Sequence, residues 1–205
     1  HCLYLFVQSA VSIKCGVMEH YDAIVVGVGG VGSSAIYYLA RRGARVLGID
    51  RFQPPHDRGS THGHTRVIRQ AYFEHPDYVP LLREAYRGWQ ELEACTGQQL
   101  FHQVGLLEAG PPDGVVVPGV LRAAAEHRLH VEPMTGTGIE SRWPAIRVRD
   151  GLAGVFEPSA GYLLVEDCVR AYLHEARAAG AQLSFDTAVQ SWSTNGSGVQ
   201  IKTVD

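Results

Sequence analysis

Several features that mark specialised classes of protein are scarce or missing in this sequence. Only 4 of its 205 residues are cysteines. Cys95 and Cys168, the two in the body of the chain, show neither Cys-x-x-Cys nor metal-type spacing. This usage favours a reducing compartment, so we expect a cytoplasmic protein, or a peroxisomal one in a eukaryote. Both thiols are predicted to act as small buried hydrophobic groups.

An excess of positive charge is also missing, because the formal net charge is −3. Without a basic field the protein has little to attract a phosphate backbone, which argues against nucleic acid as a partner. The apolar stretch at residues 3–13 is too short to span a bilayer, so no membrane partner is expected. It also lacks the initiating Met and basic start of a signal peptide. We therefore expect residues 1–17 to be a non-native or disordered extension that does not pack on the domain.

What the sequence does contain begins with a strand, a turn, a helix and a strand in close succession. Residues 23–26 form the continuous apolar run of a strand that is buried on both faces. The helix after the turn closes at Gly43, and the second strand, residues 44–49, ends at Asp50. This order predicts a βαβ unit with a right-handed crossover. The apolar stripe of the helix is predicted at Val31, Ala35, Tyr38 and Leu39.

The turn carries the pattern Gly-x-Gly-x-x-Gly at residues 27–32. Gly27 permits a tight turn, Gly29 lets a pyrophosphate approach the backbone, and Gly32 lets helix and strand pack closely. Gly30, between them, is a further candidate contact at the helix N-terminus, where free N–H groups favour phosphate. Asp50 is placed to bind ribose hydroxyls and disfavours a 2′-phosphate. The motif predicts a dinucleotide site and leaves FAD and NAD open.

The remaining elements are predicted from periodicity and from breaker residues. Residues 51–70 are rich in Pro, Gly, His and Arg, and they predict a long functional loop with one or two helical turns. A helix that opens at Asp77 should share one face among Leu82, Ala85, Trp89 and Leu92. The other predicted elements are a helix at 120–128, a helix at 165–179 and strands at 100–108, 151–156, 182–185, 188–192 and 199–204.

The loop itself resembles a known family signature. It reads Pro-Pro-His at residues 54–56, Gly-Ser-Thr-His-Gly at 59–63 and Thr-Arg-Val-Ile-Arg at 65–69. This run is similar to the flavin loop of the monomeric sarcosine oxidase and N-methyl-amino-acid oxidase family, which are FAD-dependent amine oxidoreductases of the D-amino-acid-oxidase type. The likeness continues at residues 75–81, 92–93, 105–106, 142–144 and 156–161, and it covers only the N-terminal half of such an enzyme.

The resemblance implies an α/β fold. A doubly wound, Rossmann-like FAD-binding domain, residues 18–80 and 150–205, would be interleaved with an antiparallel-sheet substrate domain that begins at residues 81–149. It also implies that FAD is the cofactor, that the cysteine attaching it covalently lies outside this chain, and that the full-length protein is a monomer. We expect these 205 residues alone to be inactive.

The resemblance further implies roles for individual residues. Arg66 would lie against the flavin ring, with Thr65 and His62 beside it, and Arg69 would bind the substrate carboxylate. Arginine forks suit carboxylates, although two ordinary salt-bridged arginines remain the alternative. The further cofactor contacts are Arg51, Ser60 and Val189, in addition to the glycines and Asp50. Metal binding by His56, His62 and His64 is not expected, because no further ligand has suitable spacing.

The reaction that the resemblance implies is oxidation of a secondary amino acid such as sarcosine to an imine, with dioxygen reduced to hydrogen peroxide. N-methyltryptophan and pipecolate are alternative substrates within the same family. A NAD-dependent dehydrogenase and a non-catalytic flavin-binding fragment are alternatives from other classes. The expected partners are therefore a small amino acid and dioxygen.

Overall fold

The polypeptide passes twice between two units in the computed structural model, which describes residues 4–14, 17–194 and 198–204. The first unit contains residues 1–64 and 164–205, and the second contains residues 65–163. An interleaved arrangement was predicted, but the predicted crossing points, at 80/81 and 149/150, differ from those observed. The reason is that β4 (Thr65–Ile68) and β9 (Gly161–Leu164) are neighbours in one sheet of the second unit. This pairing places residues 65–68 in the second unit, and pairing of residues 153–157 with residues 106–110 places that stretch there too.

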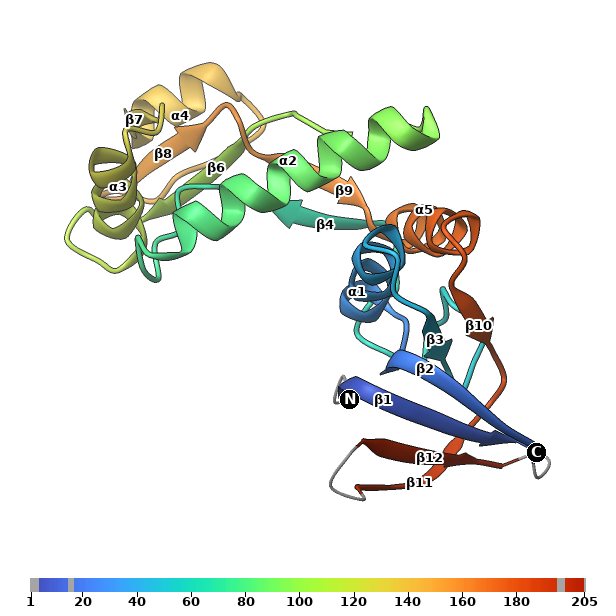
Figure 1. Cartoon of the computed structure of the whole chain (residues 1–205). Coiled ribbons are helices and arrows are strands. Elements are labelled where there is room, and N and C mark those ends of the chain that lie inside the picture. The colour runs from blue at the N-terminus through green and yellow to red at the C-terminus, as the bar shows by residue number, and fades with distance from the viewer. Residues whose placement is uncertain (1–3, 15–16, 195–197, 205) are drawn as a thin grey trace. The chain divides into compact units, whose positions relative to one another are not determined.

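The first unit is built on one six-stranded sheet in the order β10-β3-β2-β1-β12-β11 (Figure 1). Strands β10, β3 and β2 run parallel, as expected for an α/β fold, and that fold class is confirmed. β1 is antiparallel to β2 and parallel to β12, and β11 is antiparallel to β12. The strand bounds are β1 Tyr4–Lys14, β2 Val17–Val26, β3 Val46–Ile49, β10 Gln182–Ser184, β11 Val189–Thr194 and β12 Val199–Thr203.

Two helices of the first unit, α1 (Gly30–Arg41) and α5 (Val165–Ala178), pack against each other. Tyr37 and Tyr172 meet there, with ring centroids 5.2 Å apart. The apolar spacing predicts a buried stripe on α5 at Val165, Cys168, Val169, Tyr172 and Ala176, and all of these but Val165 are buried. The stripe predicted on α1 was wrong, because the residues buried there are Gly32, Ser33, Ile36, Tyr37 and Ala40. Val31 is 68% exposed. The small side chains allow close approach to α5, and the Tyr172 ring lies nearer to Tyr37 than to Tyr38, with centroid distances of 5.2 and 6.3 Å.

The sheet of the first unit is apolar on both faces. Residues 23–25 of β2 and all four residues of β3 are buried, and one buried apolar cluster is formed by Tyr21, Ile24, Leu47, Ile49 and Ile201. On β3, a methyl group added at Gly48 would lie within 2.7–2.9 Å of the Ile36, Leu183 and Val28 side chains. The glycine therefore lets α1 approach β3 closely, which positions the start of the helix beside the ends of β2 and β3.

Residues 4–14 differ from the sequence-based expectation, which left residues 1–17 outside the fold. They form β1, which pairs with β2 from Tyr4↔Val26 to Lys14↔Val17 and with β12 from Ala10↔Val199 to Ile13↔Lys202. Without β1, β2 and β12 would each present a row of unpaired N–H and C=O groups to solvent. An apolar segment of strand-forming residues provides those partners, which the search for a targeting signal did not consider.

Replacing residues 4–14 with a Gly/Ser segment of equal length should destabilise the first unit. The change weakens pairing on both sides of β1, and we expect the melting temperature to fall by more than about 5 °C. Removal of residues 1–3 alone, which leaves β1 whole, is the control and should change the melting temperature little. Equal melting of the two variants by circular dichroism would contradict the role of β1 in the sheet.

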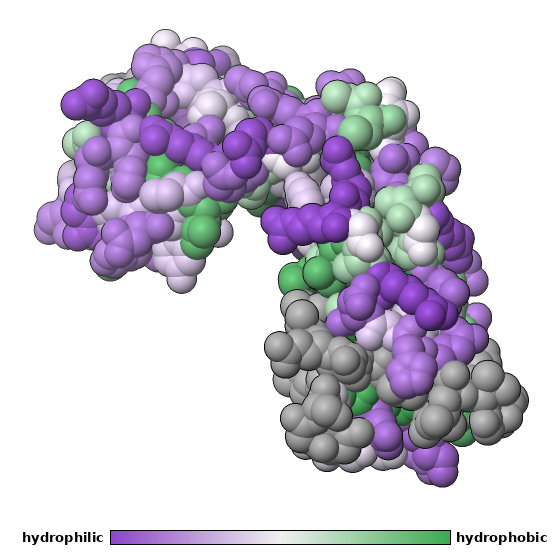
Figure 2. Space-filling model, in the orientation of Figure 1, coloured by the Kyte–Doolittle hydropathy of each residue, from purple (hydrophilic) through white to green (hydrophobic). Residues whose placement is uncertain are grey.

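The second unit contains two small sheets, ordered β4-β9-β5 and β6-β8-β7. The pairs β5/β9, β6/β8 and β7/β8 are antiparallel, although β8 and β9 lie in residues that the prediction gave to the FAD-binding domain. Its face in Figure 2 is predominantly hydrophilic, while Ala71, Val117, Val120 and Val155 form a buried cluster inside. The other bounds are α2 Tyr78–Thr96, β5 Phe101–His102, β6 Leu106–Gly110, α3 Val116–His127, β7 Glu132–Thr135, α4 Gly136–Arg142 and β8 Ala153–Glu157.

Three details of the second unit differ from the prediction. The strand predicted at 100–108 is divided between β5 and β6, because Gly105 has φ +78° and presses against the Phe156 ring. In α2, Ala85 is exposed and does not belong to the buried face on which it was predicted. Cys95 is exposed rather than buried, whereas Cys168 is buried.

Among the described residues, no helix is long and apolar enough to cross a membrane.

Candidate functional site

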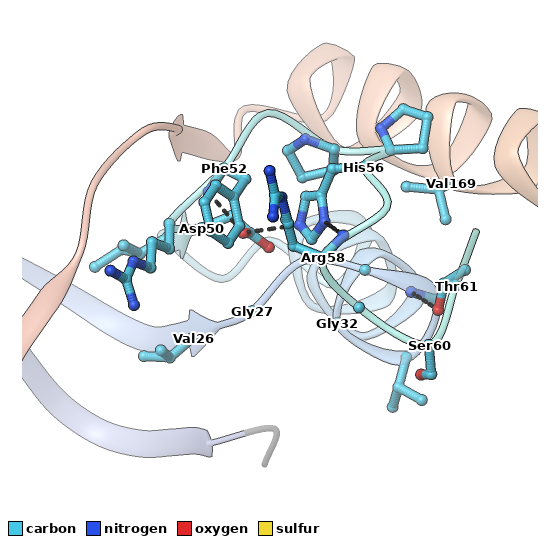
Figure 3. A pocket seen from close by; sticks show the side chains of 18 of the residues that line it. Val26, Gly27, Gly32, Asp50, Phe52, His56, Arg58, Ser60, Thr61 and Val169 are labelled. Carbon is cyan, nitrogen blue, oxygen red and sulfur yellow. Dashed lines mark hydrogen bonds and ion pairs between the residues drawn. The ribbon is translucent and has the colours of Figure 1, made fainter. Parts of the chain in front are cut away.

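A cavity of about 470 Å³ lies in the first unit, where β2 and β3 end and α1 begins (Figure 3). Gly27 makes the turn with φ +86°, and its N–H donates to the Ile49 carbonyl oxygen at 2.8 Å. This bond joins the ends of the two strands. In an open α/β sheet, the crevice beyond the carboxyl ends of the strands is where ligands bind.

The N-terminus of α1 opens onto this cavity. Its N-cap is Gly29, which has no side chain to cap the helix, and the first turn contains no acidic residue. The N–H of Gly30 donates to the Thr61 hydroxyl at 3.2 Å. A methyl group added at Gly30 would come within 2.9 Å of that oxygen, so the close approach needs the glycine. The helix start therefore keeps a surface of positive potential that suits phosphate oxygens.

Asp50 follows β3 directly and is held in place by three contacts. Its Oδ2 accepts the Val28 N–H at 2.9 Å, its Oδ1 accepts the Phe52 N–H at 3.0 Å, and His56 Nε2 lies 3.2 Å from Oδ1. Asp50 is only 7% exposed. A carboxylate has about four lone-pair directions, so these three contacts leave room for one more donor, such as a ribose hydroxyl.

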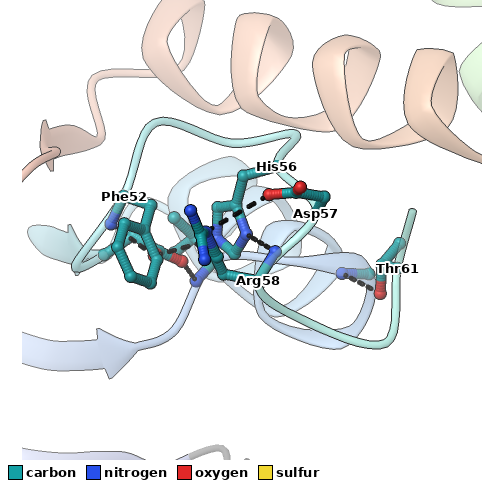
Figure 4. A network of polar contacts seen from close by, with 8 residues as sticks. Phe52, His56, Asp57, Arg58 and Thr61 are labelled. Carbon is teal, nitrogen blue, oxygen red and sulfur yellow. Dashed lines mark hydrogen bonds and ion pairs between the residues drawn. The ribbon is translucent and has the colours of Figure 1, made fainter.

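The loop after Asp50 folds back along the cavity through local contacts (Figure 4). The Arg58 N–H donates to His56 Nδ1 at 3.2 Å, and the Arg58 and Asp57 side chains form an ion pair at 3.4 Å. Further along, His62 Nδ1 lies 2.9 Å from the Gly59 carbonyl oxygen. Residues 51–64 contain no helical turn, contrary to the prediction. Side-chain contacts with the backbone take the place of helical bonds in a segment rich in Pro and Gly.

The predicted site residues fall into two groups. Those that line the cavity are Gly27, Gly29, Gly30, Gly32, Asp50, Arg51, Ser60 and Val189. Four other described residues, His62, Thr65, Arg66 and Arg69, lie outside the lining. His62 is exposed in the first unit, and the other three belong to the second. The roles given to all of these residues stay predictions.

In the loop after the dinucleotide motif, sequence reasoning missed four polar or aromatic lining residues, Phe52, His56, Arg58 and Thr61, and elsewhere it missed Thr187. Both His56 and Thr61 lie in the family signature, but the resemblance assigns neither of them a cofactor contact. The available signal was their position in the loop that directly follows the dinucleotide motif. Among the described residues, no group of three or more His, Cys, Asp or Glu side chains could hold a metal ion.

Arg69 lies in the second unit between two acidic side chains. Its Nη2 donates to both carboxylate oxygens of Glu74, at 3.1 and 3.2 Å, and its Nε is 3.3 Å from Glu108 Oε1. The guanidinium carbon lies 4.3 Å from the centroid of the Tyr72 ring. Arg66, by contrast, is exposed, and its Nη1 donates to the Thr65 carbonyl oxygen at 2.8 Å.

The acidic residues around Arg69 have distinct environments. Burial raises the pKa of Glu108, the Arg69 guanidinium opposes that shift, and Glu157 and Glu74 add to it. Glu157 is 1% exposed and accepts N–H groups from Gln70 and Ala71, both at 2.9 Å. One arginine and three carboxylates therefore form a compact polar cluster.

The cavity of the first unit fits the adenosine diphosphate part of a dinucleotide. Its glycine-lined helix N-terminus suits a pyrophosphate, and the fixed carboxylate of Asp50 suits ribose hydroxyls rather than a 2′-phosphate. Val31, Val169 and Val189 add apolar lining. These features are the ones that the adenosine diphosphate portion of FAD would need from its binding site.

Comparison with known proteins decides between the cofactors that the motif left open. The chain is 41% identical over 187 residues to monomeric sarcosine oxidase from Bacillus sp. (strain B-0618), covering 91% of this chain and 48% of that protein. It is 40% identical over 185 residues to N-methyl-L-tryptophan oxidase from Yersinia pestis (strain Pestoides F), covering 90% and 50%. The chain thus spans about half the length of the curated relatives it matches.

A structural relative agrees. A mutant of NikD, an unusual amino acid oxidase essential for nikkomycin biosynthesis, superposes with a TM-score of 0.79 at 28% identity, covering 88% of this chain and 46% of that one. The family model described as FAD dependent oxidoreductase matches residues 22–205. The predicted resemblance and the prediction of FAD are confirmed, and the chain belongs to the family of FAD-dependent oxidoreductases.

Proposed function

We propose that the complete protein uses FAD to oxidise a secondary, N-methyl amino acid such as sarcosine to an imine, with dioxygen reduced to hydrogen peroxide. The observation that carries this proposal is the cavity at the start of α1, combined with about 40% identity to enzymes named for N-methyl amino acids. We also propose that the complete protein acts as a monomer, as the name of one relative states.

Within this proposal, the predicted cofactor-binding residues of the first unit have distinct roles. The glycines at the start of α1 would hold the pyrophosphate, and Asp50 would accept a ribose hydroxyl. Arg51, Ser60 and the backbone of Val189 would complete the cofactor contacts. All of them line the cavity. Bound FAD supplies the chemistry of accepting a hydride from the carbon beside the substrate nitrogen and passing electrons to dioxygen.

The second unit would contribute the residues that hold the substrate. Arg69 would bind the carboxylate through its fork of N–H donors. Arg66 would place a positive charge near the flavin ring. Thr65 and His62 would lie beside Arg66. A cation there favours the reduced, anionic form of the ring.

The test is to purify the complete protein, add FAD, record the visible spectrum and assay peroxide. Sarcosine, N-methyltryptophan and pipecolate are the substrates to compare. We expect a flavin spectrum and peroxide with at least one of them. A protein that binds NAD and gives no flavin spectrum would instead support a dehydrogenase.

Arg69→Lys in the complete protein should mainly raise KM for N-methyl amino acids. The charge stays, but the planar fork is lost, and losing one charge-assisted hydrogen bond weakens binding by about 1.5–3 kcal/mol. This corresponds to a rise in KM of roughly tenfold or more. Arg142→Lys, which changes an arginine paired with Glu132 in the same unit, is the matched control. An unchanged KM in the Arg69 variant would remove Arg69 from the substrate site.

A further inference from the structure

The two acidic partners of Arg69 differ in how firmly they are held. Glu108 lies on β6, in register with Val155 of β8, and its side chain is 12% exposed. Glu74 lies outside any helix or strand, and its side chain is 45% exposed. A ligand carboxylate can therefore take the place of Glu74 at Nη2 while Glu108 keeps its contact with Nε.

The charges around Glu108 are unbalanced. Arg69 is the cation that acts on it, while Glu74 and Glu157 act as like charges. Glu157 is buried, and its partners are neutral donors: two backbone N–H groups and the Ser159 hydroxyl, which donates at 2.8 Å. Once Glu74 is displaced, Arg69 and Glu108 form a pair with no net charge.

We propose that Glu108 is a specificity-determining residue that orients the Arg69 guanidinium and cancels its charge, so that the site takes substrates with one carboxylate and rejects those with a second acidic group. This inference rests on the proposed function of Arg69 as the carboxylate-binding residue. The class of substrate is a zwitterionic amino acid whose side chain carries no negative charge.

The physical reason is that the fork of Arg69 can satisfy one carboxylate by directional hydrogen bonds without net attraction. Among the described residues, Arg69 is the cation that acts on Glu108, so a second carboxylate would meet Glu108 without compensation from this part of the protein. Two like charges about 7 Å apart, at an effective dielectric constant of about 20, lower the binding affinity roughly tenfold or more. If Glu108 had a purely structural role, changing it would instead weaken the binding of monocarboxylates and dicarboxylates equally.

The experiment measures binding of acetate and of malonate to the complete, FAD-loaded protein by isothermal titration calorimetry. Wild type, Glu108→Gln and Glu132→Gln are compared, the last being a glutamate that pairs with Arg142 elsewhere in the unit. Arg69→Met confirms that binding is at Arg69. We expect wild type to bind malonate at least about tenfold more weakly than acetate, Glu108→Gln to remove most of that ratio, and Glu132→Gln to keep it.

The pH dependence gives a second readout. Burial raises the pKa of Glu108, so its negative charge is present above that raised pKa and is lost as pH falls through it. Discrimination against malonate should therefore fade on acidification in wild type. Because malonate itself takes up a proton on acidification, the ratio is expressed for the fully ionised ligand in both proteins, and in Glu108→Gln this corrected ratio should not fade.

Each outcome separates this inference from the function on which it rests. An unchanged ratio in Glu108→Gln, or an equal change in Glu132→Gln, would overturn the role of Glu108 even if N-methyl amino acids are oxidised. If the ratio changes as expected but no N-methyl amino acid is oxidised, the proposed activity fails and the role of Glu108 stands. Should Glu108→Gln fail to fold, Glu108→Met carries the same test.

Discussion

Replacing Glu157 with leucine is expected to destabilise the second unit by about 3–5 kcal/mol, a large part of the roughly 5–15 kcal/mol that holds a typical domain together. Glu157 ends β8 and is 1% exposed. Its carboxylate accepts the Gln70 and Ala71 N–H groups and the Ser159 hydroxyl. Leucine leaves these donors without a partner, and each buried unsatisfied donor costs about 1–3 kcal/mol.

Urea unfolding of wild type and variants measures this effect. Glu132→Leu is the control, because that side chain is 37% exposed and pairs with Arg142, and such exposed pairs contribute at most about 1 kcal/mol. The stability of Glu157→Gln should lie between those of Glu157→Leu and Glu132→Leu. The carbonyl oxygen of the glutamine still accepts a hydrogen bond, but its NH₂ group faces other donors. A Glu157→Leu midpoint equal to that of Glu132→Leu would show that the carboxylate does not hold residues 70–71 in place.

The parts of the fold that were predicted correctly are those set by local sequence. The βαβ unit was found because its glycines, its buried strand and Asp50 lie within a short stretch and impose a definite geometry. The stripe of α5 was found because its apolar spacing is regular. The α1 stripe was missed because its buried side packs against α5, which is far away in sequence.

The domain boundaries and β1 depended on non-local pairing. β4 belongs to the second unit because β9 lies beside it, and the two are almost a hundred residues apart. No local signal marks such a partner. The prediction excluded β1 because residues 1–17 lack the initiating Met and basic start of a signal peptide and were expected to be a non-native or disordered extension, although an apolar strand-forming segment can satisfy open strand edges.

The candidate site shows the same division. The residues of the glycine turn and Asp50 were predicted from spacing alone, and they line the cavity. His56 and Thr61 were missed, because their contacts with Asp50 and Gly30 arise from the path of an irregular loop. Glu108 could not be anticipated at all, since a strand residue in the sequence gives no indication that it faces Arg69.

Asp50→Ala is expected to weaken binding of FAD to the complete protein by more than about a hundredfold. One hydrogen bond from a ribose hydroxyl to a charged acceptor is worth about 1.5–3 kcal/mol. The same change releases the Val28 and Phe52 N–H groups and His56, so the turn before α1 loses its anchor. Asp50→Asn keeps one acceptor oxygen and should lose roughly tenfold in affinity.

Asp22 offers a matched control for this experiment, because its Oδ2 accepts the Arg45 N–H at 2.8 Å within the same βαβ unit but away from the cavity. Asp22→Ala should therefore bind FAD like wild type. Affinity is measured by quenching of flavin fluorescence, and thermal melts of the FAD-free proteins show whether a variant is folded at the titration temperature. A folded Asp50→Ala protein with wild-type affinity, or equal losses in the Asp22 and Asp50 variants, would mean that the carboxylate after β3 does not bind the cofactor.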